Sequence, residues 1–292
     1  MQTQADNKSS VEERPAHDRR KLTETGLANI NGININYRSQ GDGEPLFMIS
    51  GFGSSQGSWW PQTRIFKKHY RVITFDNLGV GKSDKPEGPY STKMMAKDAT
   101  GLMDYLSIQK AHVLGASMGG MIAQELAINY PDRVNKLVLA CTFAARDETG
   151  GPTAEGAKAK EIHGKPLSSS AHMIKYSDNL SHLIFSRLSF KIFVAPLMML
   201  MSRFARPSAA IGLSGQLDAI LAHDTIDRLK QIQAPTLVIT GTQDRLIKPA
   251  SSEVLARLIP KAKLVKIEGG SHTFSIEMSS QFNREVLNFL EN

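Results

Sequence analysis

A serine lies between two glycines in the stretch HVLGASMGGMIAQE, residues 112–125, where an apolar run gives way to a helix-like run. Gly115 and Gly119 flank Ser117 at a spacing of two residues. A sharp turn from strand to helix strains the serine backbone and lifts the hydroxyl clear of the sheet, while the glycines let strand and helix approach closely. The pattern makes Ser117 a candidate nucleophile. The alternative is a packing turn in which the serine takes no part in chemistry.

A serine hydroxyl is a weak nucleophile at neutral pH, so it needs a general base whose tautomer is fixed by a third group. His272 follows an apolar run in the segment IEGGSHTF, and Asp244 follows another in GTQDRLIKP. The chain order Ser, Asp, His is the one that the serine turn predicts. We therefore assign His272 as the base and Asp244 as the orienting acid, with Asp147, which follows the preceding apolar run, as the rival acid.

The other histidines fit the base position less well. His112 lies at the opposite end of the apolar run that leads to Ser117, His69 follows two lysines, and His17 is in the N-terminal tail. We expect these three to be structural or surface residues. A further group could line a pocket: His163, His172, His182 and His223.

Acyl transfer also needs two convergent N–H donors for the developing oxyanion. One is expected from Met118, the residue after the nucleophile, and the other from the glycine-rich loop SGFGSSQGSWW, residues 50–60. We assign the second donor to the backbone N–H of Phe52. Gly51 and Trp59 in the same loop are candidate substrate contacts.

Short apolar runs alternate with helix-length segments from residue 26 onward. A hairpin is expected first, with Asn31-Gly32 as its turn. Strands are predicted at 45–50, 71–76, 111–116, 134–141, 234–241 and 262–269, and helices near 57–68, 91–107, 118–130 and at the C-terminus. Runs that are apolar throughout are typical of strands covered on both faces, so the pattern predicts an α/β fold with a mainly parallel sheet and crossover helices.

The alternation stops near residue 145 and resumes at 234. Residues 146–233 contain helix-like segments without a convincing strand, so we predict a helical lid inserted into a core formed by 26–145 and 234–292, after a polar tail at 1–25. The lid carries the run FKIFVAPLMMLM. Met198 and Met201 in that run could contact an apolar part of the substrate, or they could be lid core.

Composition narrows the class of protein. The chain has 292 residues, of which 41% are hydrophobic and 22% charged, and one cysteine, Cys141. That cysteine can form no intrachain disulfide, and no cluster of side chains has metal-ligand spacing, so neither metal nor organic cofactor is expected. The net charge of +7 is spread thinly rather than concentrated as in a nucleic-acid groove. No segment resembles a membrane span or a signal peptide, which predicts a cytoplasmic protein.

These motifs resemble the α/β-hydrolase family over nearly the whole chain from residue 26. The resemblance rests on GASMGGMIAQELA, on SGFGSS, on FDNLGVGKSDKP at 75–86, and on the segments of Asp244 and His272. Within the family, the sequence is similar to the lid-bearing serine hydrolases that include 3-oxoadipate enol-lactone hydrolases, meta-cleavage C–C hydrolases and small carboxylesterases. Two positions depart from the common pattern: Ser50 stands where His is frequent, and Leu78 stands where Arg is frequent.

The resemblance implies a cofactor-independent hydrolase that acts on a small, largely apolar ester or lactone through a Ser117, Asp244 and His272 triad. A serine nucleophile argues against haloalkane dehalogenases and epoxide hydrolases, which use aspartate. Two further hypotheses stay open: cleavage of a C–C bond or acyl transfer by the same triad, and a ligand-sensing protein with slow turnover. The sequence does not indicate the oligomeric state.

Overall fold

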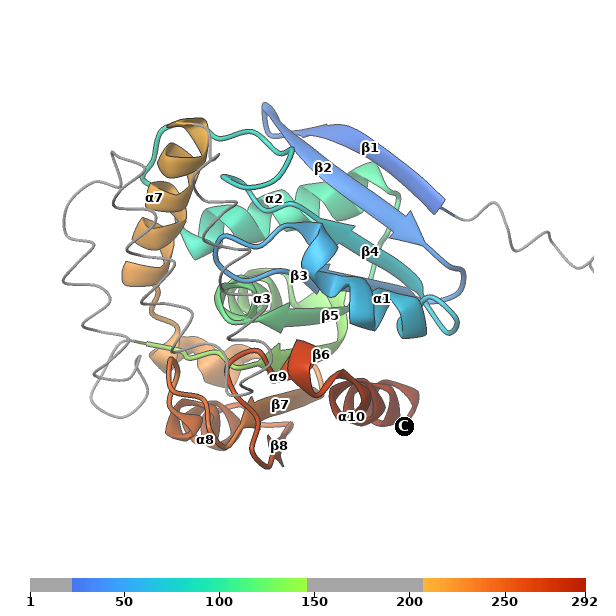
Figure 1. Ribbon diagram of the computed structural model, residues 1–292, viewed down its shortest axis with the longest axis vertical. Coiled ribbons are helices and arrows are strands. Elements are labelled where there is room, and N and C mark those ends of the chain that lie inside the picture. Colours follow the sequence, from blue (N-terminus) through green and yellow to red (C-terminus); the bar gives the residue numbers. More distant parts are fainter. Residues whose placement is uncertain (1–22, 146–206) are drawn as a thin grey trace, which may run out of the picture.

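The computed structural model describes residues 23–145 and 207–292. Within these ranges eight strands form one sheet in the order β1-β2-β4-β3-β5-β6-β7-β8 (Figure 1). The strands are β1 (Thr23–Ile30), β2 (Ile33–Gln40), β3 (Pro45–Ile49), β4 (Arg71–Phe75), β5 (Ala111–Ala116), β6 (Val134–Ala140), β7 (Thr236–Gly241) and β8 (Ala262–Ile267). The helices are η2 (Gln56–Trp59), α1 (Trp60–Phe66), α2 (Thr92–Tyr105), α3 (Met118–Asn129), η3 (Pro131–Arg133), α7 (Pro207–Leu221), η4 (Ile226–Gln231), α8 (Pro249–Leu258), α9 (Phe274–Glu277) and α10 (Ser279–Glu291).

The sheet is antiparallel at one edge and parallel elsewhere. β1 and β2 form the predicted hairpin, whose turn residues Asn31 and Gly32 both have positive φ, at 53° and 84°. β2 pairs antiparallel with β4, and every pairing from β4 through β3, β5, β6 and β7 to β8 is parallel. The mainly parallel sheet with crossover helices that the apolar runs predict is therefore confirmed. β1 begins at Thr23, three residues before the expected hairpin, because Thr23 to Thr25 pair with the end of β2.

Helices cover both faces of the sheet and enclose two apolar cores. Side chains of α2, α3 and α8 pack on one face, and those of α1 and α10 pack on the other. The central strands need cover on both sides because nearly every residue of β3, β5 and β7 is buried. All parallel strands then point their carboxyl ends to one edge of the sheet, where the loops that follow them meet.

The predicted lid falls mostly outside the described residues. Asp147, Met198 and Met201 belong to 146–206, so their roles, like the lid boundaries, stay predictions. The described remainder of that segment consists of α7 and η4, and α7 stands at the left of the molecule in Figure 1. No helix within the described ranges has both the length and the apolarity that crossing a membrane requires.

Candidate active site

Ser117 occupies the turn between β5 and α3. Its backbone has φ 55° and ψ −122°, which a non-glycine residue adopts only at a cost of about 1–3 kcal/mol. Its N–H donates to the carbonyl of Ala140 on β6 at 2.9 Å, so the sheet holds the strained residue in place. The flanking glycines make the turn possible, since a Cβ on Gly115 would lie 2.2 Å from the carbonyl oxygen of Gly119.

Three side chains from three strand ends form a connected chain of hydrogen bonds. His272 Nε2 lies 3.1 Å from Ser117 Oγ, and His272 Nδ1 lies 2.8 Å from Asp244 Oδ2. Ser117 follows β5, Asp244 follows β7, and His272 follows β8. The fold thus brings together residues 155 positions apart, at the edge where parallel strands place their carboxyl ends.

Asp244 is held so that only one of its oxygens faces the imidazole. Its Oδ1 accepts from the N–H groups of Leu246 at 2.9 Å and Ile247 at 2.8 Å, and its side chain is fully buried. These two bonds leave Oδ2 to accept from His272 Nδ1. A carboxylate placed there favours the tautomer whose Nε2 can accept the serine proton.

The loop that carries His272 has its own polar support, which the sequence did not lead us to expect. The hydroxyl of Ser271 donates to the buried carboxylate of Glu277 and accepts from the N–H of Thr273 at 3.1 Å. The N–H of Gln243 donates to the carbonyl of Gly270 at 2.8 Å, which joins this loop to the one bearing Asp244. The spacing of Ser271 and Glu277 around a short helix is the local signal that could have indicated this support.

The glycine-rich loop after β3 passes directly beside Ser117. A Cβ placed on Gly51 would lie 3.2 Å from Ser117 Cβ, so the backbone of the loop packs closely against the side chain of Ser117. Met118, the residue of the other expected donor, opens α3, where helix geometry leaves the N–H without an intrahelical acceptor. Met118 is thus the next residue after Ser117, and Phe52 is the next residue after Gly51, whose backbone packs beside Ser117.

Two side-chain amides brace that loop, in which Ser50 stands where histidine is frequent in the family. Asn77 Nδ2 donates to the carbonyl of Ser50 at 2.8 Å, and Gln216 Oε1 accepts from the N–H of Gly53 at 2.9 Å. Leu78, the other departure, is buried, and its carbonyl accepts from Gln216 Nε2 at 2.8 Å. Sequence reasoning missed Gln216 because nothing local marks it.

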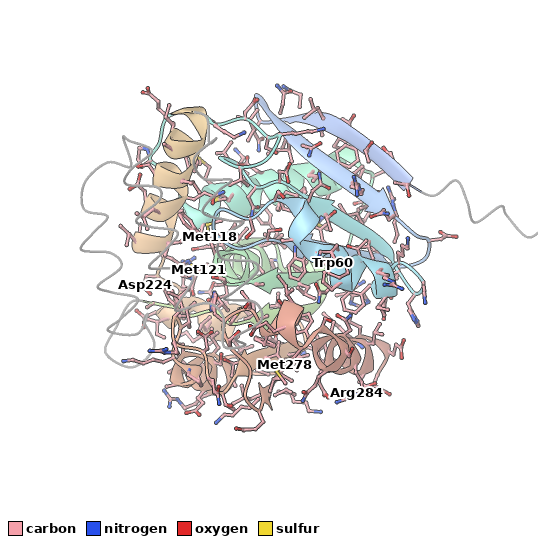
Figure 2. All side chains as sticks on the ribbon, in the orientation of Figure 1. Trp60, Met118, Met121, Asp224, Met278 and Arg284 are labelled. Carbon is pink, nitrogen blue, oxygen red and sulfur yellow. The ribbon has the colours of Figure 1, made fainter. Side chains whose placement is uncertain are left out.

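The remaining candidate residues of the loop are placed differently. Trp59 is 3% exposed and packs in the core under α1 and α10, where its Nε1 has no hydrogen-bond partner among the described residues. Trp60 is 63% exposed and lies at the start of α1 (Figure 2). Trp59 is the last residue of η2 and shares an apolar core cluster with Phe66 of α1. Its role as a substrate contact stays a prediction.

Two of the other histidines are buried and neutralised by their surroundings. His112 lies 3.0 Å from Glu44, and burial lowers its pKa although Glu44 opposes that shift. His223 bonds Thr92 at 3.0 Å, and burial lowers its pKa to about 4. Their ring nitrogens thus contact Glu44 and Thr92 rather than Ser117. His69, which pairs with Glu291, is at the surface.

Cys141 lies under the candidate site. It follows β6, has φ 42° and is fully enclosed. Burial, together with the negative charge of Asp244, raises the pKa of its thiol well above the usual range. A protonated buried thiol is a poor nucleophile, so Cys141 packs beneath Ser117 rather than competing with it. Among the described residues, no group of three potential ligands is placed to hold a metal ion.

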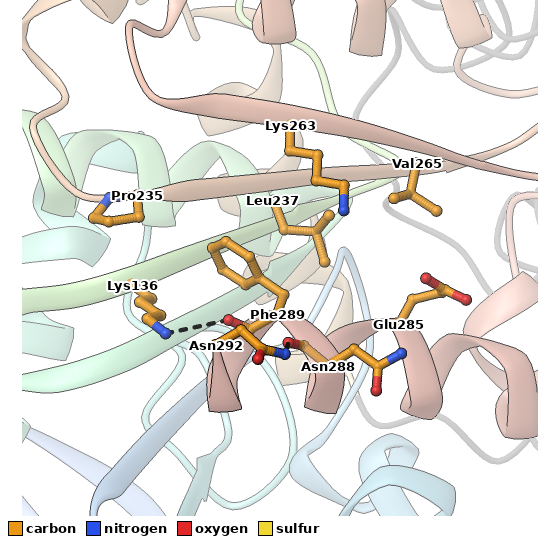
Figure 3. Close-up of a pocket in the computed structure, with 9 residues that line it drawn as sticks. All are labelled: Lys136, Pro235, Leu237, Lys263, Val265, Glu285, Asn288, Phe289 and Asn292. Atoms are coloured by element: carbon orange, nitrogen blue, oxygen red, sulfur yellow. Dashed lines mark hydrogen bonds between the residues drawn. The ribbon is translucent and has the colours of Figure 1, made fainter.

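A groove of about 510 Å³ lies near the amino ends of the parallel strands, away from Ser117. It is bounded by the amino-terminal parts of β6, β7 and β8 and by the end of α10 (Figure 3). Lys136 Nζ donates to the carbonyls of Phe289 and Leu290 at that end of α10. Because the strands are parallel, this groove is at the amino ends and Ser117 is at the carboxyl ends. The groove is therefore separate from the candidate active site.

Comparison with known proteins agrees with this architecture. The family model for the alpha/beta hydrolase fold matches residues 44–278. The chain is 33% identical to a poly(3-hydroxyalkanoate) depolymerase from Ectopseudomonas oleovorans, over 85% of this chain and 84% of the relative. The crystal structure of an enol-lactonase from Burkholderia xenovorans superposes with a TM-score of 0.79 and 28% identity, covering 91% of this chain and 100% of that one. A meta-cleavage product hydrolase from Pseudomonas fluorescens superposes with a TM-score of 0.76 and 28% identity, covering 92% and 98%.

The chain belongs to the α/β-hydrolase fold family. The family match spans the sheet from β3 to β8 and includes the loops of Ser117, Asp244 and His272. The chain also matches more than four fifths of the length of relatives named as a carbamate hydrolase, an enol-lactonase and a poly(3-hydroxyalkanoate) depolymerase. Together with the family match, these relatives identify a hydrolase of the α/β type.

Proposed function

We propose that this protein is a serine hydrolase that cleaves a carboxylic ester or lactone through an acyl-enzyme. The observation that carries the proposal is the unbroken chain of hydrogen bonds from Ser117 Oγ through His272 to Asp244, at 3.1 and 2.8 Å. A nucleophile, a base and an orienting acid within hydrogen-bond reach are the arrangement that acyl transfer requires.

Acylation begins when Ser117 Oγ attacks the carbonyl carbon and His272 Nε2 takes the hydroxyl proton. The carbonyl π electrons move to oxygen, and the N–H groups of Phe52 and Met118 stabilise the resulting oxyanion. The oxyanion then collapses, the bond to the leaving oxygen breaks, and His272 returns the proton to that oxygen. In a lactone the leaving alcohol stays attached to the acyl chain.

Deacylation repeats these steps with water as the nucleophile. His272 takes a proton from the water, hydroxide adds to the acyl carbon, and the second tetrahedral intermediate releases Ser117 with the proton from His272. Asp244 remains ionised and stabilises the imidazolium in both halves of the reaction. Each group is used twice, and no step requires a metal.

An apolar cluster at the carboxyl edge supports a largely apolar acyl group. Met121, Phe143 and Ile247 are buried together, and Ile220 of α7 packs against them. Met118 and Met121 both belong to α3 and lie toward the α7 side in Figure 2. Phe143 follows β6 and Ile247 follows β7, so the cluster lies at the same edge of the sheet as Ser117. We propose that it forms part of the wall that the acyl group contacts.

Hydrolysis of a C–C bond next to a ketone is the second candidate. The structural likeness to a meta-cleavage product hydrolase, at 28% identity, favours C–C hydrolysis over acyl transfer to another acceptor and over ligand sensing with slow turnover. The same three side chains could serve that reaction, since a C–C hydrolase also needs a base and an oxyanion site. Acyl transfer and ligand sensing would use these residues as well.

Product analysis separates these candidates. The purified protein is incubated with p-nitrophenyl esters of increasing acyl length, an enol-lactone, a vinylogous diketone and a polyester oligomer, with the Ser117→Ala variant as the matched control. We expect steady turnover of an ester or lactone, loss of that turnover in the variant, and no effect of EDTA. Turnover of the diketone alone would replace the ester assignment with C–C hydrolysis. At most a few turnovers, together with a ligand-induced rise in melting temperature, would indicate a sensor.

A further inference from the structure

Gln216 joins α7 to the two loops that flank the candidate oxyanion site. Its side chain is fully buried, its Oε1 accepts from the N–H of Gly53 at 2.9 Å, and its Nε2 donates to the carbonyl of Leu78 at 2.8 Å. Both ends of one amide therefore contact main chain in segments that follow β3 and β4. A buried amide with both ends satisfied on backbone fixes the distance between those segments.

The position of α7 is set by close backbone packing on the same side of the helix. A Cβ on Gly212 would lie 2.0 Å from the carbonyl oxygen of Gly79, and one on Gly215 would lie 2.6 Å from the ring of Tyr90. Gly212, Gly215 and Gln216 are three and four residues apart, so they share one face of the helix. This face lies against the loop after β4, which places Gln216 within reach of Gly53.

Asn77 holds the same loop from the other end. Its Nδ2 donates to the carbonyl of Ser50, and Gln216 accepts from the N–H of Gly53, so the two amides bracket Gly51 and Phe52. Asn77 and Leu78 are neighbours in the loop after β4. Asn77 attaches this loop to Ser50 directly, and Gln216 attaches Leu78 to Gly53, so both contacts fix the oxyanion loop to the same segment. Asp76 adds to that rigidity, because its carboxylate accepts from the N–H groups of Gln56 at 2.7 Å and Lys82 at 2.9 Å.

We propose that Gln216 is a positioning residue that aims the Phe52 N–H at the oxyanion and makes the geometry of the oxyanion site depend on the placement of α7. The inference rests on the proposed serine hydrolase function, since it concerns the donor of that reaction. Gln216 does not touch the reacting atoms. It acts through Gly53, the residue next to Phe52 in the chain.

The first test is the variant Gln216→Met, which keeps the length and burial of the side chain and removes both hydrogen bonds. We expect kcat for p-nitrophenyl acetate to fall about 10- to 100-fold with KM changed less than about threefold, since misplacing one donor weakens only the transition state. The inhibition constant of a trifluoromethyl ketone, whose serine adduct carries an oxyanion, should rise by the same factor.

Gln124→Met is the matched control. Gln124 is also fully buried, and it also connects the core to the segment before β7: its Nε2 donates to the carbonyl of Phe143 at 3.0 Å and its Oε1 accepts from Thr225 at 2.6 Å. Both of these partners lie outside the oxyanion loop. A comparable fall in melting temperature with kcat and the inhibition constant unchanged is expected for this variant.

Gln216→Glu adds a readout that loss of packing would not produce. A protonated carboxyl can accept from Gly53 and donate to Leu78, whereas an ionised one repels the Leu78 carbonyl. Burial raises the pKa of such a carboxyl. The ratio of variant to wild-type kcat should therefore rise as the pH is lowered, with the titration of the base cancelling in the ratio. This variant also serves if Gln216→Met fails to fold.

The outcomes are distinguishable. Wild-type protein that neither reacts with a fluorophosphonate nor hydrolyses esters would overturn the proposed function and this inference with it. An active wild type whose Gln216→Met and Gln216→Glu variants keep kcat and the inhibition constant would overturn the inference alone. An equal loss of kcat in the Gln124→Met control would also overturn the inference. A general loosening of the segment before β7, to which both glutamines connect, would then explain the loss in the Gln216 variants.

Discussion

Two pairs of a buried imidazole and a carboxylate lie at opposite ends of the parallel strands. His272 and Asp244 are 2.8 Å apart at the carboxyl edge, and His112 and Glu44 are 3.0 Å apart at the amino edge. His112 is the second residue of β5 and Ser117 follows its last, so about 16 Å of strand separates the two sites, at about 3.3 Å per residue. The chemical groups in the two pairs are the same.

The two pairs differ in what the second ring nitrogen of the histidine contacts and in how exposed the carboxylate is. His272 Nε2 faces Ser117 Oγ, whereas His112 Nδ1 has no hydrogen-bond partner in the described part of the chain and the ring packs edge-on against Tyr70. The side chain of Asp244 is fully buried, and that of Glu44 is 55% exposed. A histidine and carboxylate become a base and its orienting acid only where a third group offers a proton and water is kept away.

Replacing the third group should produce the largest effect. Ser117→Ala removes the proton donor that distinguishes the His272 pair, and we expect kcat to fall by at least about 10⁴-fold and fluorophosphonate labelling to disappear. The hydroxyl carries little packing, so the melting temperature should stay close to that of the wild type. Labelling that persists in the variant would place the nucleophile elsewhere.

The second largest loss of kcat is expected when Asp244, the carboxylate that contacts His272, is replaced. Asp244→Asn keeps the shape of the side chain, but the amide cannot stabilise the imidazolium and favours the wrong tautomer, so kcat should fall roughly 10³- to 10⁴-fold. Steady-state kinetics measures the effect, with Asp147→Asn as the parallel variant in which we expect a far smaller loss. A reversal of the two effects would transfer the role of acid to Asp147.

A third buried imidazole shows what happens when no carboxylate among the described residues contacts the ring nitrogens. Burial lowers the pKa of His223 from 6.5 to about 4, partly opposed by the charges of Glu125 and Asp224. Between these two pH values the unfolded chain binds a proton that the folded chain does not, so stability falls as the pH is lowered. We expect this one histidine to lower the free energy of unfolding by about 3 kcal/mol as the pH falls from 6.5 to about 4.

Urea unfolding at a series of pH values measures that contribution. His223→Asn retains a polar atom near the position that bonds Thr92 but cannot titrate, so the variant should lose less stability than the wild type over the same pH range. Its kcat at about pH 7.5 should remain within about threefold, since His223 lies outside the hydrogen-bonded chain of the candidate site. Identical pH dependence in the two proteins would show that another group controls acid stability.

The smallest effect is expected at the amino-edge pair. Glu44→Gln removes the charge beside His112 but leaves an oxygen that can still accept, and the side chain is more than half exposed. Surface ion pairs contribute about 0–1 kcal/mol, so the free energy of unfolding should change by less than about 1 kcal/mol. We expect kcat to change less than about twofold. A loss as large as that of Asp244→Asn would mean that the two pairs are not functionally distinct.

Local patterns predicted most of the core elements. The apolar runs that predict strands at 45–50, 111–116 and 134–141 match β3, β5 and β6 to within one residue at each end, because strands buried on both faces carry an unbroken apolar signal. Helix α8, between β7 and β8, and the four-residue helix α9, directly before α10, were not predicted. The candidate acid and base could be found from the sequence because each lies in the loop that follows a strand, Asp244 after β7 and His272 after β8.

The sequence by itself determined the fold class and singled out Ser117, Asp244 and His272 as candidates, because each lies in a local setting that its neighbours define. The structure brings these three side chains into hydrogen-bond contact. Only the tertiary structure decided what holds the loop after β3, where Asn77 donates to the carbonyl of Ser50 and Gln216 accepts from the N–H of Gly53. Gln216 and Gly53 are 163 residues apart, and their contact depends on how deeply α7 packs against the loop after β4. The position of one helix against another segment follows from packing of the whole core, which no local spacing of residues encodes.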